Sequence, residues 1–523
     1  MLDIKSMADK AAVEAAKPVA EQWGPRSVYA MLSETSEKFP TRPALSFQIK
    51  SGPKDRCETL NWTEFRAAVT QAANALRSLG VGPDDTVAYV LPNCNETAIT
   101  LLAGMTAGRV NPINPLLDPE NIAGILRESG AKTVVTLAPF PKTDVAEKVA
   151  AAVELAPGVT TVLEVDLTRY LSPPTSWIVP LVRPKRKNAK SAVYKDFWSV
   201  VSAAPAAALS FEELDGDPIC AYFHTGGTTG LPKLAQHRHS GILYNGWLGK
   251  SYIYTEEDVL ICTLPLFQVF GAYPVMMSVL FSGAHLVMPT PAGYRGDGVM
   301  DNFWKLVERH KVTFLITVPT AAAALMQRPI DADVSTLRFA ICGSAPLPVE
   351  LFNRFEKATG VKICEGYGMT EATCLVSINP PAGERKIVSV GLPFPYTDVR
   401  ILNCDHSGTV LRECEVEEIG EICVANPGVM LDCVYTETDR NVGLLAEEKY
   451  LRTGDLGRMD RDGYLYITGR AKDLIIRGGH NIDPALIEEA LMAHPKVAFV
   501  GAIGQPDAAA GELFLGEQQI LVL

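Results

Sequence analysis

Apolar and polar residues follow two different periods along most of the chain. Residues 61–81 place apolar side chains at helical spacing, with Asn61 or Thr63 available as the helix N-cap. The side chains on that predicted face are Phe65, Val69, Ala72, Leu76 and Leu79. The runs DTVAYVL and AKTVVTL predict buried strands, and NETAITLLAGMTAG between them predicts a helix. The alternation continues through VTFLITV, LRFAICG and VKICEGYG, which predicts a mostly parallel α/β sheet with helices on both faces.

The pattern changes near residue 385, where TDVRILN, GEICVAN and GYLYITG predict short antiparallel strands separated by turns. A further unit of strand, turn and helix begins at residue 470. We therefore expect a large N-terminal domain, residues 1–469, with α/β subdomains at about 30–384 and a small β-barrel at 385–469, followed by a small, mobile α+β C-terminal domain at 470–523 that is incomplete.

Composition excludes several classes of protein. The 523 residues are 47% apolar and 21% charged, as in ordinary globular proteins, and the net charge of −12 disfavours a nucleic-acid binder. Most of the eleven cysteines sit singly among apolar residues and are expected to be core thiols. The series Cys404, Cys414, Cys423 and Cys433 has no close Cys-x(2–4)-Cys pair, which disfavours structural zinc.

Two segments bear on location. The first 23 residues carry charges throughout and have no apolar core of signal-peptide length, so we expect a cytoplasmic protein. The most apolar window, residues 271–288, is interrupted by Pro274, Gly283 and His285. A buried helix followed by a strand is therefore favoured there over a membrane span.

Residues 166–210 are interpreted as an insertion. The stretch SPPTSWIVPLVRPKRKNAKS is rich in proline and carries a basic cluster of Arg183, Lys185, Arg186 and Lys187. A solvated loop is the favoured interpretation, since charge runs are usually solvated. Contact with an anionic lipid surface, by residues 177–190, is the less favoured alternative, because Trp177, Ile178 and Val179 precede the charges.

The stretch TGGTTGLPK, residues 225–233, has the composition of an anion-binding loop. Glycine allows consecutive backbone amides to approach one anion, threonine adds hydroxyl donors, and Lys233 adds a compact positive charge. Such a loop suits a polyphosphate, although a plain turn remains the alternative. It is not a Walker A loop, because Leu231 and Pro232 separate the last glycine from the lysine.

The wider pattern resembles the acyl-adenylate-forming superfamily, which includes acyl-CoA synthetases, peptide-synthetase adenylation domains and luciferases. TGGTTGLPK is similar to that family's phosphate loop, and the family's later motifs follow in order. These are PLFQVFG (265–271), GSAP (343–346), YGMTE (367–371), YLRTGD (450–455) and GRAKDLIIRGGHNIDP (469–484). The resemblance runs from about residue 30 to 510, with a gap over the insertion.

The resemblance implies a role for each matching residue. Thr370, Glu371 and the hinge residue Lys472 would be catalytic, and Glu371 would be the Mg²⁺ ligand, which suits the preference of magnesium for few carboxylates. ATP or AMP would be bound by Thr225, Gly226, Gly227, Thr228, Thr229, Gly230, Lys233, Gly343, Ser344, Ala345, Pro346, Glu365, Gly366, Tyr367, Gly368, Asp455, Ile467 and Arg470. An acyl and coenzyme A tunnel would be lined by Gln268, Val269, Phe270, Gly271, Thr373, Gly478 and Gly479.

Three departures from the family pattern stand out. The family's catalytic C-terminal lysine would lie beyond Leu523, so the resemblance implies a truncated C-terminal domain. Gln268 stands where the family often has histidine, and glutamine carries no charge at any pH. Leu234 follows Lys233 where glycine is usual. His224, His237 and His239 flank the loop and are expected to be structural or solvent-facing.

The implied function is an acyl-CoA ligase that uses ATP, Mg²⁺ and coenzyme A to activate a hydrophobic carboxylic (fatty) acid. Positioning and charge neutralisation would supply most of the catalysis, because AMP is a good leaving group. Two alternatives remain open at this point. One is an acyl-AMP ligase that delivers the acyl group to a carrier protein, and the other is a nucleotide or acyl-adenylate binding protein with little turnover.

Overall fold

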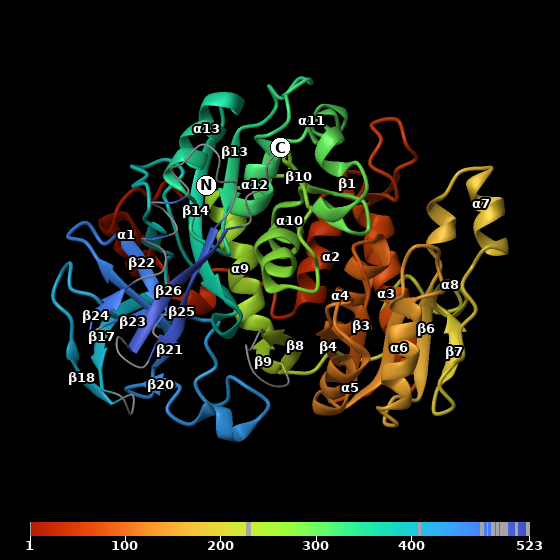
Figure 1. Cartoon of the computed structure of the whole chain (residues 1–523). Coiled ribbons are helices and arrows are strands. Elements are labelled where there is room, and N and C mark those ends of the chain that lie inside the picture. The colour runs from red at the N-terminus through yellow and green to blue at the C-terminus, as the bar shows by residue number, and fades with distance from the viewer. Residues whose placement is uncertain are drawn as a thin grey trace.

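The computed structural model describes residues 2–225, 232–405 and 409–470, and beyond residue 470 chiefly four strands. Figure 1 shows two α/β sheets side by side, with an antiparallel sheet at one end of the molecule. The helices are α1 Met7–Ala16, α2 Val28–Lys38, α3 Trp62–Ser78, α4 Asn95–Ala107, α5 Pro119–Glu128, α6 Val145–Glu154, α7 Thr175–Ile178, α8 Phe197–Val201, α9 His239–Tyr252, α10 Ser278–Ser282, α11 Val299–His310, α12 Pro319–Leu325 and α13 Val349–Thr359.

The first α/β sheet has the strand order β7-β6-β5-β3-β4-β8-β9. Every pairing is parallel except that of β9, which returns antiparallel to β8. Its strands are β3 Thr86–Val90, β4 Arg109–Pro112, β5 Ala131–Leu137, β6 Thr161–Val165, β7 Val193–Asp196, β8 Ile219–Thr225 and β9 Lys233–Arg238. The edge strand β7 belongs to the segment interpreted as an insertion, which therefore extends this sheet.

The second α/β sheet has the order β16-β15-β14-β13-β12-β10-β11-β1-β2 and is parallel from β14 to β1. Its strands are β1 Pro43–Gln48, β2 Glu58–Asn61, β10 Val259–Ile261, β11 His285–Pro289, β12 Phe314–Thr317, β13 Phe339–Cys342, β14 Lys362–Met369, β15 Cys374–Ile378 and β16 Leu392–Pro393. The carboxyl ends of β13 and β14 lead directly into GSAP and the end of YGMTE. Loops at the carboxyl ends of parallel strands are where α/β sheets usually bind ligands.

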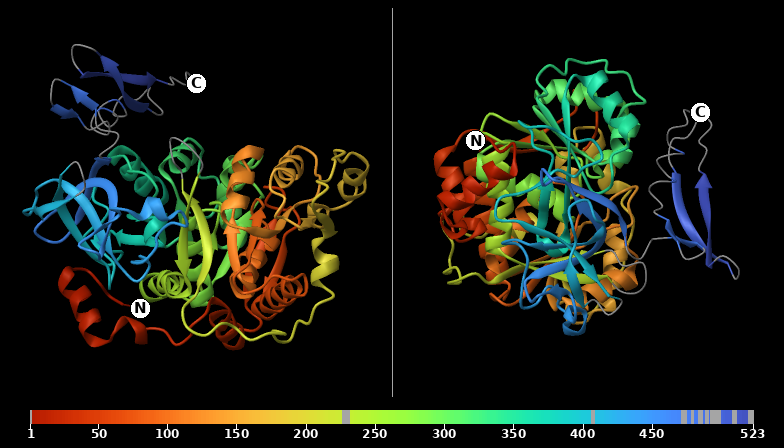
Figure 2. Two further views of the ribbon diagram at one scale, coloured as in Figure 1. Left: turned by 90° about the horizontal axis from the view of Figure 1, so that it is seen from below. Right: turned by 90° about the vertical axis from the view of Figure 1, so that its left-hand side faces the viewer.

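Two antiparallel sheets complete the described fold. The first has the order β18-β17-β19-β21-β20, with β22 paired to β21. Its strands are β17 Asp398–Cys404, β18 Val410–Glu413, β19 Gly420–Ala425, β20 Leu445–Ala446, β21 Tyr450–Met459 and β22 Leu465–Arg470. The second, of β23 Ile475–Arg477, β24 His480–Ile482, β25 Val500–Asp507 and β26 Gly511–Gln518, stands to one side of the rest of the molecule (Figure 2).

Two predictions from the sequence pattern, the Asn61 helix cap and the interrupted apolar window, are confirmed. Asn61 caps α3 and forms a reciprocal capping box with Glu64, which satisfies donors at the helix start. The apolar window 271–288 forms a buried π-helix, Gly271–Met277, then α10 and β11, as the interrupted pattern predicted. Within the described residues, no helix has both the length and the apolar content needed to cross a membrane.

The cysteines are free thiols. The described part of the chain brings together no group of three or more histidine, cysteine, aspartate or glutamate side chains with the spacing of a metal site. Burial raises the pKa of Cys94, Cys220 and Cys342 well above the usual value for a thiol, which keeps these side chains neutral.

A buried carboxylate anchors the insertion to the first sheet. Glu96 at the start of α4 is fully buried and accepts hydrogen bonds from Tyr170 Oη at 2.9 Å and Trp198 Nε1 at 2.7 Å. Arg169 Nη1 lies 3.2 Å from the same carboxylate, and its guanidinium stacks over Trp198 at 4.6 Å. All three partners come from residues 166–210, so the base of the insertion is folded, whereas the lysines of the basic stretch are exposed, as expected for the solvated loop that the sequence favoured.

Replacing Glu96 tests this anchor against a matched control. Arg169 also binds Glu58 at 3.0 Å, and that carboxylate is partly exposed. We expect Glu96→Gln to lower the free energy of unfolding by about 3 kcal/mol, because it unbalances a buried ion pair. Glu58→Gln should cost about 1 kcal/mol or less, because water screens the exposed pair. Urea unfolding followed by fluorescence measures both, and equal losses would contradict this account.

Candidate functional site

A hairpin holds the two ends of the Gly/Thr loop together. β8 and β9 pair antiparallel, and the register places Thr225 directly opposite Lys233. The loop residues Gly226, Gly227, Thr228, Thr229 and Gly230 lie outside the described residues, as do Lys472, Gly478 and Gly479. The hairpin neck therefore fixes the position of the lysine, at the carboxyl end of β8.

A segment from the antiparallel region pairs with β9 and delivers a tyrosine to this lysine. Gln236 N donates to Val434 O at 2.8 Å, and Thr436 N donates to Leu234 O at 3.0 Å. Between them, Tyr435 places its ring 4.9 Å from Lys233 Nζ, a cation–π distance. Leu234, which replaces the family's usual glycine, is buried and contributes its carbonyl to this pairing.

Tyr435 also contacts the predicted magnesium ligand. Its hydroxyl donates to Glu371 Oε1 at 2.5 Å, and burial together with this carboxylate raises the pKa of Tyr435 above its usual value. The tyrosine therefore remains a donor at neutral pH. Lys233, Tyr435 and Glu371 form one chain of contacts in which a cation and a carboxylate face the same space.

The buried side chain of His237 positions the backbone of the YGMTE motif. Its Nε2 lies 2.7 Å from Thr370 O, and its Nδ1 lies 2.9 Å from Tyr273 Oη. Burial lowers the pKa of His237 to about 4, so the ring is neutral near pH 7. A carbonyl can only accept, so Nε2 carries the proton and Nδ1 accepts from the Tyr273 hydroxyl. His237 is structural, as expected, and it is not solvent-facing.

The pair Asp455 and Arg470 is set by strand register. β21 and β22 pair antiparallel and place the two residues opposite each other, and Arg470 Nε donates to Asp455 Oδ1 at 2.9 Å. Tyr367 Oη donates to the other carboxylate oxygen, Oδ2, at 2.5 Å. Because Tyr367 ends up against Asp455, YGMTE and YLRTGD, which are far apart in sequence, share one site.

These groups surround a cavity of about 1280 Å³. Predicted site residues that line it are Thr225, Lys233, Gln268, Val269, Phe270, Gly343, Ser344, Gly366, Tyr367, Gly368, Thr370, Glu371 and Arg470. Its charged side chains are those of Lys233, Glu371, Glu421, Arg440, Arg452 and Arg470. The cavity has two halves, because those charges come only from β9, from Glu371 and from the region after residue 420.

The chain is similar to known families and proteins. The chain matches the AMP-binding enzyme family over residues 32–432. The chain belongs to the AMP-binding enzyme family. It is 35% identical to a marinolic acid–CoA ligase of a Pseudoalteromonas species over 95% of this chain and 73% of that protein. It is 30% identical to a long-chain-fatty-acid–CoA ligase of Bacillus subtilis, over 93% of this chain and 84% of that protein.

A solved structure agrees. ATP-bound MatB from Rhodopseudomonas palustris superimposes with a TM-score of 0.78 at 26% identity, covering 94% of this chain and 88% of that one. The chain is an AMP-forming acid–thiol ligase, which activates a carboxylic acid with ATP to an acyl adenylate and forms a thioester with coenzyme A. Transfer to a carrier protein is not better supported. The truncation of the C-terminal domain stays a prediction.

Some predicted residues lie outside the cavity lining of the ligase. Thr373 is fully buried and donates to Gly428 O at 2.5 Å, so Cys374 and Leu375 line the cavity beside it. At Gly271 an added Cβ would lie 2.5 Å from Pro265 O, so close packing explains why this position has no side chain. Also absent from the lining are Ala345, Pro346, Glu365, Asp455 and Ile467.

Glu365 holds the backbone of the residue that follows GSAP. It is almost fully buried, accepts a hydrogen bond from Leu347 N at 2.9 Å, and its pKa is raised by burial to about 7. Asp455 is likewise buried behind the lining but reaches it through Tyr367 and Arg470. Both side chains bind residues next to the cavity, and neither forms its wall.

Sequence reasoning missed Tyr435 and the role of His237. A strand has a period of two, so Lys233, Ala235 and His237 must share one face of β9, and this signal could have placed His237 inward. Nothing local identifies Tyr435, because its position depends on pairing between segments about 200 residues apart. Arg440 and Arg452 were missed for the same reason.

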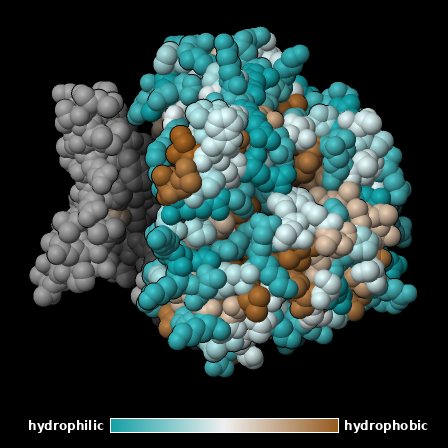
Figure 3. Space-filling model, turned by 90° about the vertical axis from the view of Figure 1, so that its right-hand side faces the viewer, coloured by the Kyte–Doolittle hydropathy of each residue, from teal (hydrophilic) through white to brown (hydrophobic). Residues whose placement is uncertain are grey.

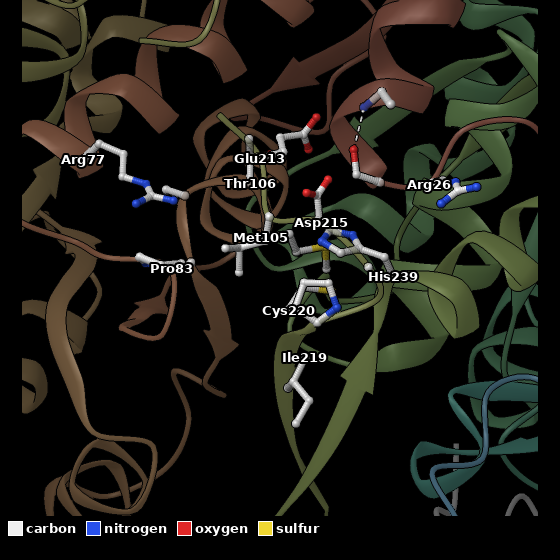
Figure 4. Close-up of a pocket in the computed structure, with 17 residues that line it drawn as sticks. Arg26, Arg77, Pro83, Met105, Thr106, Glu213, Asp215, Ile219, Cys220 and His239 are labelled. Carbon is white, nitrogen blue, oxygen red and sulfur yellow. Dashed lines mark hydrogen bonds between the residues drawn. The ribbon is translucent and has the colours of Figure 1, made fainter. Parts of the chain in front are cut away.

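The ligase has a second, smaller cavity of about 200 Å³ that shares no lining residue with the first (Figure 4). Glu213 and Asp215 precede β8, and His239 begins α9 at its wall. Burial raises the pKa of Glu213 and lowers that of His239 to about 4. His239 Nδ1 accepts from Val28 N at 3.3 Å, so this histidine also has a structural contact.

The buried neutral state of His237 makes a pH-dependent prediction. An unfolded histidine has a pKa of about 6.5, so the unfolded chain binds the proton first as pH falls. Stability from His237 is therefore complete above about pH 6.5 and declines as pH falls toward the folded pKa of about 4. In His237→Gln the amide can still donate to Thr370 and accept from Tyr273, but it does not titrate. We therefore expect the free energy of unfolding of this variant to fall less steeply between pH 6 and 4.5, by about 1.4 kcal/mol per pH unit.

Urea unfolding at several pH values measures this slope. Gln has the same donor and acceptor capacity but does not titrate, so the variant should unfold like the wild type near pH 7.5. An unchanged slope in the His237→Gln protein would show that His237 is not the group that takes up the proton.

Proposed function

We propose that the ligase acts on a neutral, largely apolar carboxylic acid. The observation that carries this proposal is the second half of the cavity, lined by residues from 248–278, 316–344 and 374–394. No Asp, Glu, Lys or Arg belongs to this described lining. A charged substituent on the acid would lose hydration there and gain no partner, which costs several kcal/mol or more.

The apolar lining is formed by side chains from several elements. They are Leu248, Ile253, Val269, Phe270, Pro274, Ile316, Ile341, Leu375, Ile378 and Phe394. Gly343 is closely packed, because an added Cβ would be 3.3 Å from both Phe270 Cζ and Gly366 O. A small residue at this position leaves room between the two halves, which suits the joining of a carboxylate to a nucleotide.

The charged half suits ATP. Lys233 offers a cation toward phosphate oxygens, and Asp455, which lies just behind the lining and is held by Tyr367 and Arg470, would offer the remaining lone pairs of its carboxylate to ribose hydroxyls. Glu371 fits Mg²⁺, because it is a single carboxylate held by Tyr435 in a space that phosphate oxygens would share. When bound, the ion would neutralise charge on the departing pyrophosphate.

The reaction then follows from positioning. A carboxylate oxygen of the acid attacks the α-phosphorus of ATP, the bond to the bridging oxygen breaks, and pyrophosphate leaves with the electron pair. The thiolate of coenzyme A attacks the acyl carbon of the adenylate, and AMP leaves. Gln268, in the cavity lining, carries no charge at any pH and would contact this path only as a hydrogen-bonding group.

One relative supports the apolar substrate. The Bacillus subtilis protein is a long-chain-fatty-acid–CoA ligase. Family members differ in the acids they take, so the lining of this chain, and not the name of a relative, carries the choice of substrate class.

Asp455 tests the nucleotide half. We expect Asp455→Asn to weaken AMP binding by tenfold or more, because an amide cannot accept at both positions, and hydrogen bonds to a charged group contribute about 1.5–3 kcal/mol. Titration calorimetry with AMP measures the affinity. Asp432→Asn is the matched control, since Asp432 binds Arg238 at 2.9 Å on the surface and lies outside the cavity. Equal affinity in the two variants would contradict a ribose role for Asp455.

Val269 tests the acyl half. It is partly buried, packs against the edge of the core and lines the cavity, so Val269→Asp should place a charge there. We expect a loss of at least 100-fold in kcat/KM for aliphatic and aromatic acids, with AMP affinity unchanged. Val269→Asn is the control of similar size and should lose much less, because the cost lies in the buried charge.

A panel of acids completes this test on the wild-type protein. Pyrophosphate release should be strong with aliphatic or aromatic monocarboxylic acids and weak with dicarboxylic or sulfonated acids of matched length. Preference for the charged acids would overturn the proposed substrate class while leaving the ligase assignment intact.

A further inference from the structure

The tip of the insertion exposes large apolar side chains. α7 and the following turn of 3₁₀-helix, Val179–Leu181, carry Trp177 and Leu181, whose exposed fractions are 70% and 83%. Ile178 and Val182 beside them are 51% and 58% exposed. Val179, by contrast, is buried and packs inward. Figure 1 shows α7 at the end of the molecule opposite the antiparallel sheet, and Figure 3 faces that end.

The charge around this tip is of one sign. Residues 167–195 contain no aspartate or glutamate, in a chain whose net charge is −12. The basic residues of this stretch are Arg169, Arg183, Lys185, Arg186, Lys187, Lys190 and Lys195. A local excess of cations in an acidic protein indicates a surface for an anionic partner.

Two arginines of this stretch form ion pairs within the protein, whereas three lysines are exposed to solvent. Arg183 binds Asp166 and Thr168, and Arg186 lies 2.6 Å from Glu164 and stacks over Tyr194 at 4.7 Å. These pairs neutralise the nearest carboxylates and fix the backbone of the tip. Lys185, Lys187 and Lys190 are exposed, and none has an ion pair among the described residues. Three exposed lysines therefore follow four exposed apolar side chains.

The tip is held firmly at its base. Arg169, Tyr170 and Trp198 bind the buried Glu96, so the two ends of the tip segment are fixed to the first sheet. Lys190 N also donates to Glu154 Oε2 at 2.9 Å. The anchor fixes where the tip leaves the sheet, and its apolar side chains form an exposed patch of the kind that marks an interaction surface.

We propose that this tip docks the ligase on an anionic phospholipid surface. Trp177, Ile178, Leu181 and Val182 would enter the boundary between headgroups and acyl chains, and Lys185, Lys187 and Lys190 would contact headgroup phosphates. Apolar insertion and a basic patch together give the two signals that reversible anchoring needs. Lysine suits this role, because its flexible stem lets the ammonium follow a fluid surface.

A lipid surface fits better than a folded protein partner. The apolar tip is a few side chains wide, whereas a stable protein interface buries about 800 Å² per partner. The arginines, which usually make the fixed contacts of protein interfaces, point into the molecule here. No tip residue lines either cavity, so docking leaves both halves of the active site free.

Vesicle binding tests the proposal with the full chain. The protein is sedimented with vesicles of phosphatidylcholine, with and without phosphatidylglycerol, at low and high salt. We expect binding to the anionic vesicles at least tenfold tighter than to the neutral ones, and weaker at high salt. Trp177→Ser/Leu181→Ser should lose more than tenfold in affinity. Lys185→Gln/Lys187→Gln should lose about fivefold per lysine.

A matched control uses exposed apolar residues elsewhere. Leu411 and Val416, at the β17–β18 end, are 63% and 56% exposed, and Leu411→Ser/Val416→Ser should bind vesicles like the wild type. All variants should keep wild-type AMP affinity, which shows that they fold. Absent or equal binding to the two vesicle types, or unchanged binding by the tip variants, would overturn the proposal. So would tip-dependent self-association on gel filtration without vesicle binding.

Discussion

The site depends on the pairing of β9 with residues 434–436, because it joins a parallel α/β sheet to the antiparallel region across about 200 residues of sequence. Only two backbone hydrogen bonds flank Tyr435, yet they fix its ring against Lys233 and its hydroxyl against Glu371. Without this pairing, the cation at the hairpin neck and the carboxylate of YGMTE would belong to separate units. The charged half of the cavity is thus formed by contact between the two sheets.

Two buried ionisable side chains are accommodated in different ways: His237 is neutral, and Glu96 is surrounded by hydrogen-bond donors. His237 is uncharged, so its position requires only two hydrogen bonds, and it can bind the backbone beside Glu371 without adding a charge to the site. Glu96 has three donors around its carboxylate, one of them from a guanidinium that also contacts Glu58. Burial without such partners would be costly in either case.

The sequence was sufficient for features that depend on neighbours in the chain. The helix over residues 62–78, its Asn61 cap and the strands through DTVAYVL and AKTVVTL follow from periodicity and local hydrogen bonding. The resemblance identified the family, and the comparisons bear this out. Residues whose importance comes from distant partners, such as Tyr435 and Glu96, were not predictable. The basic run of the insertion was expected to be solvated, which holds for Lys187 but not for Arg186, because only tertiary packing places Arg186 beside Glu164.

Arg470 has two structural roles. It is the last residue of β22, from which the chain continues to the separate sheet of β23–β26, and its guanidinium orients Asp455. A rotation of the backbone beyond residue 470 acts on torsion angles adjacent to the one that directs this side chain. Because Arg470 both ends β22 and donates to Asp455, a change of backbone direction at this residue would also reorient the guanidinium that holds this carboxylate.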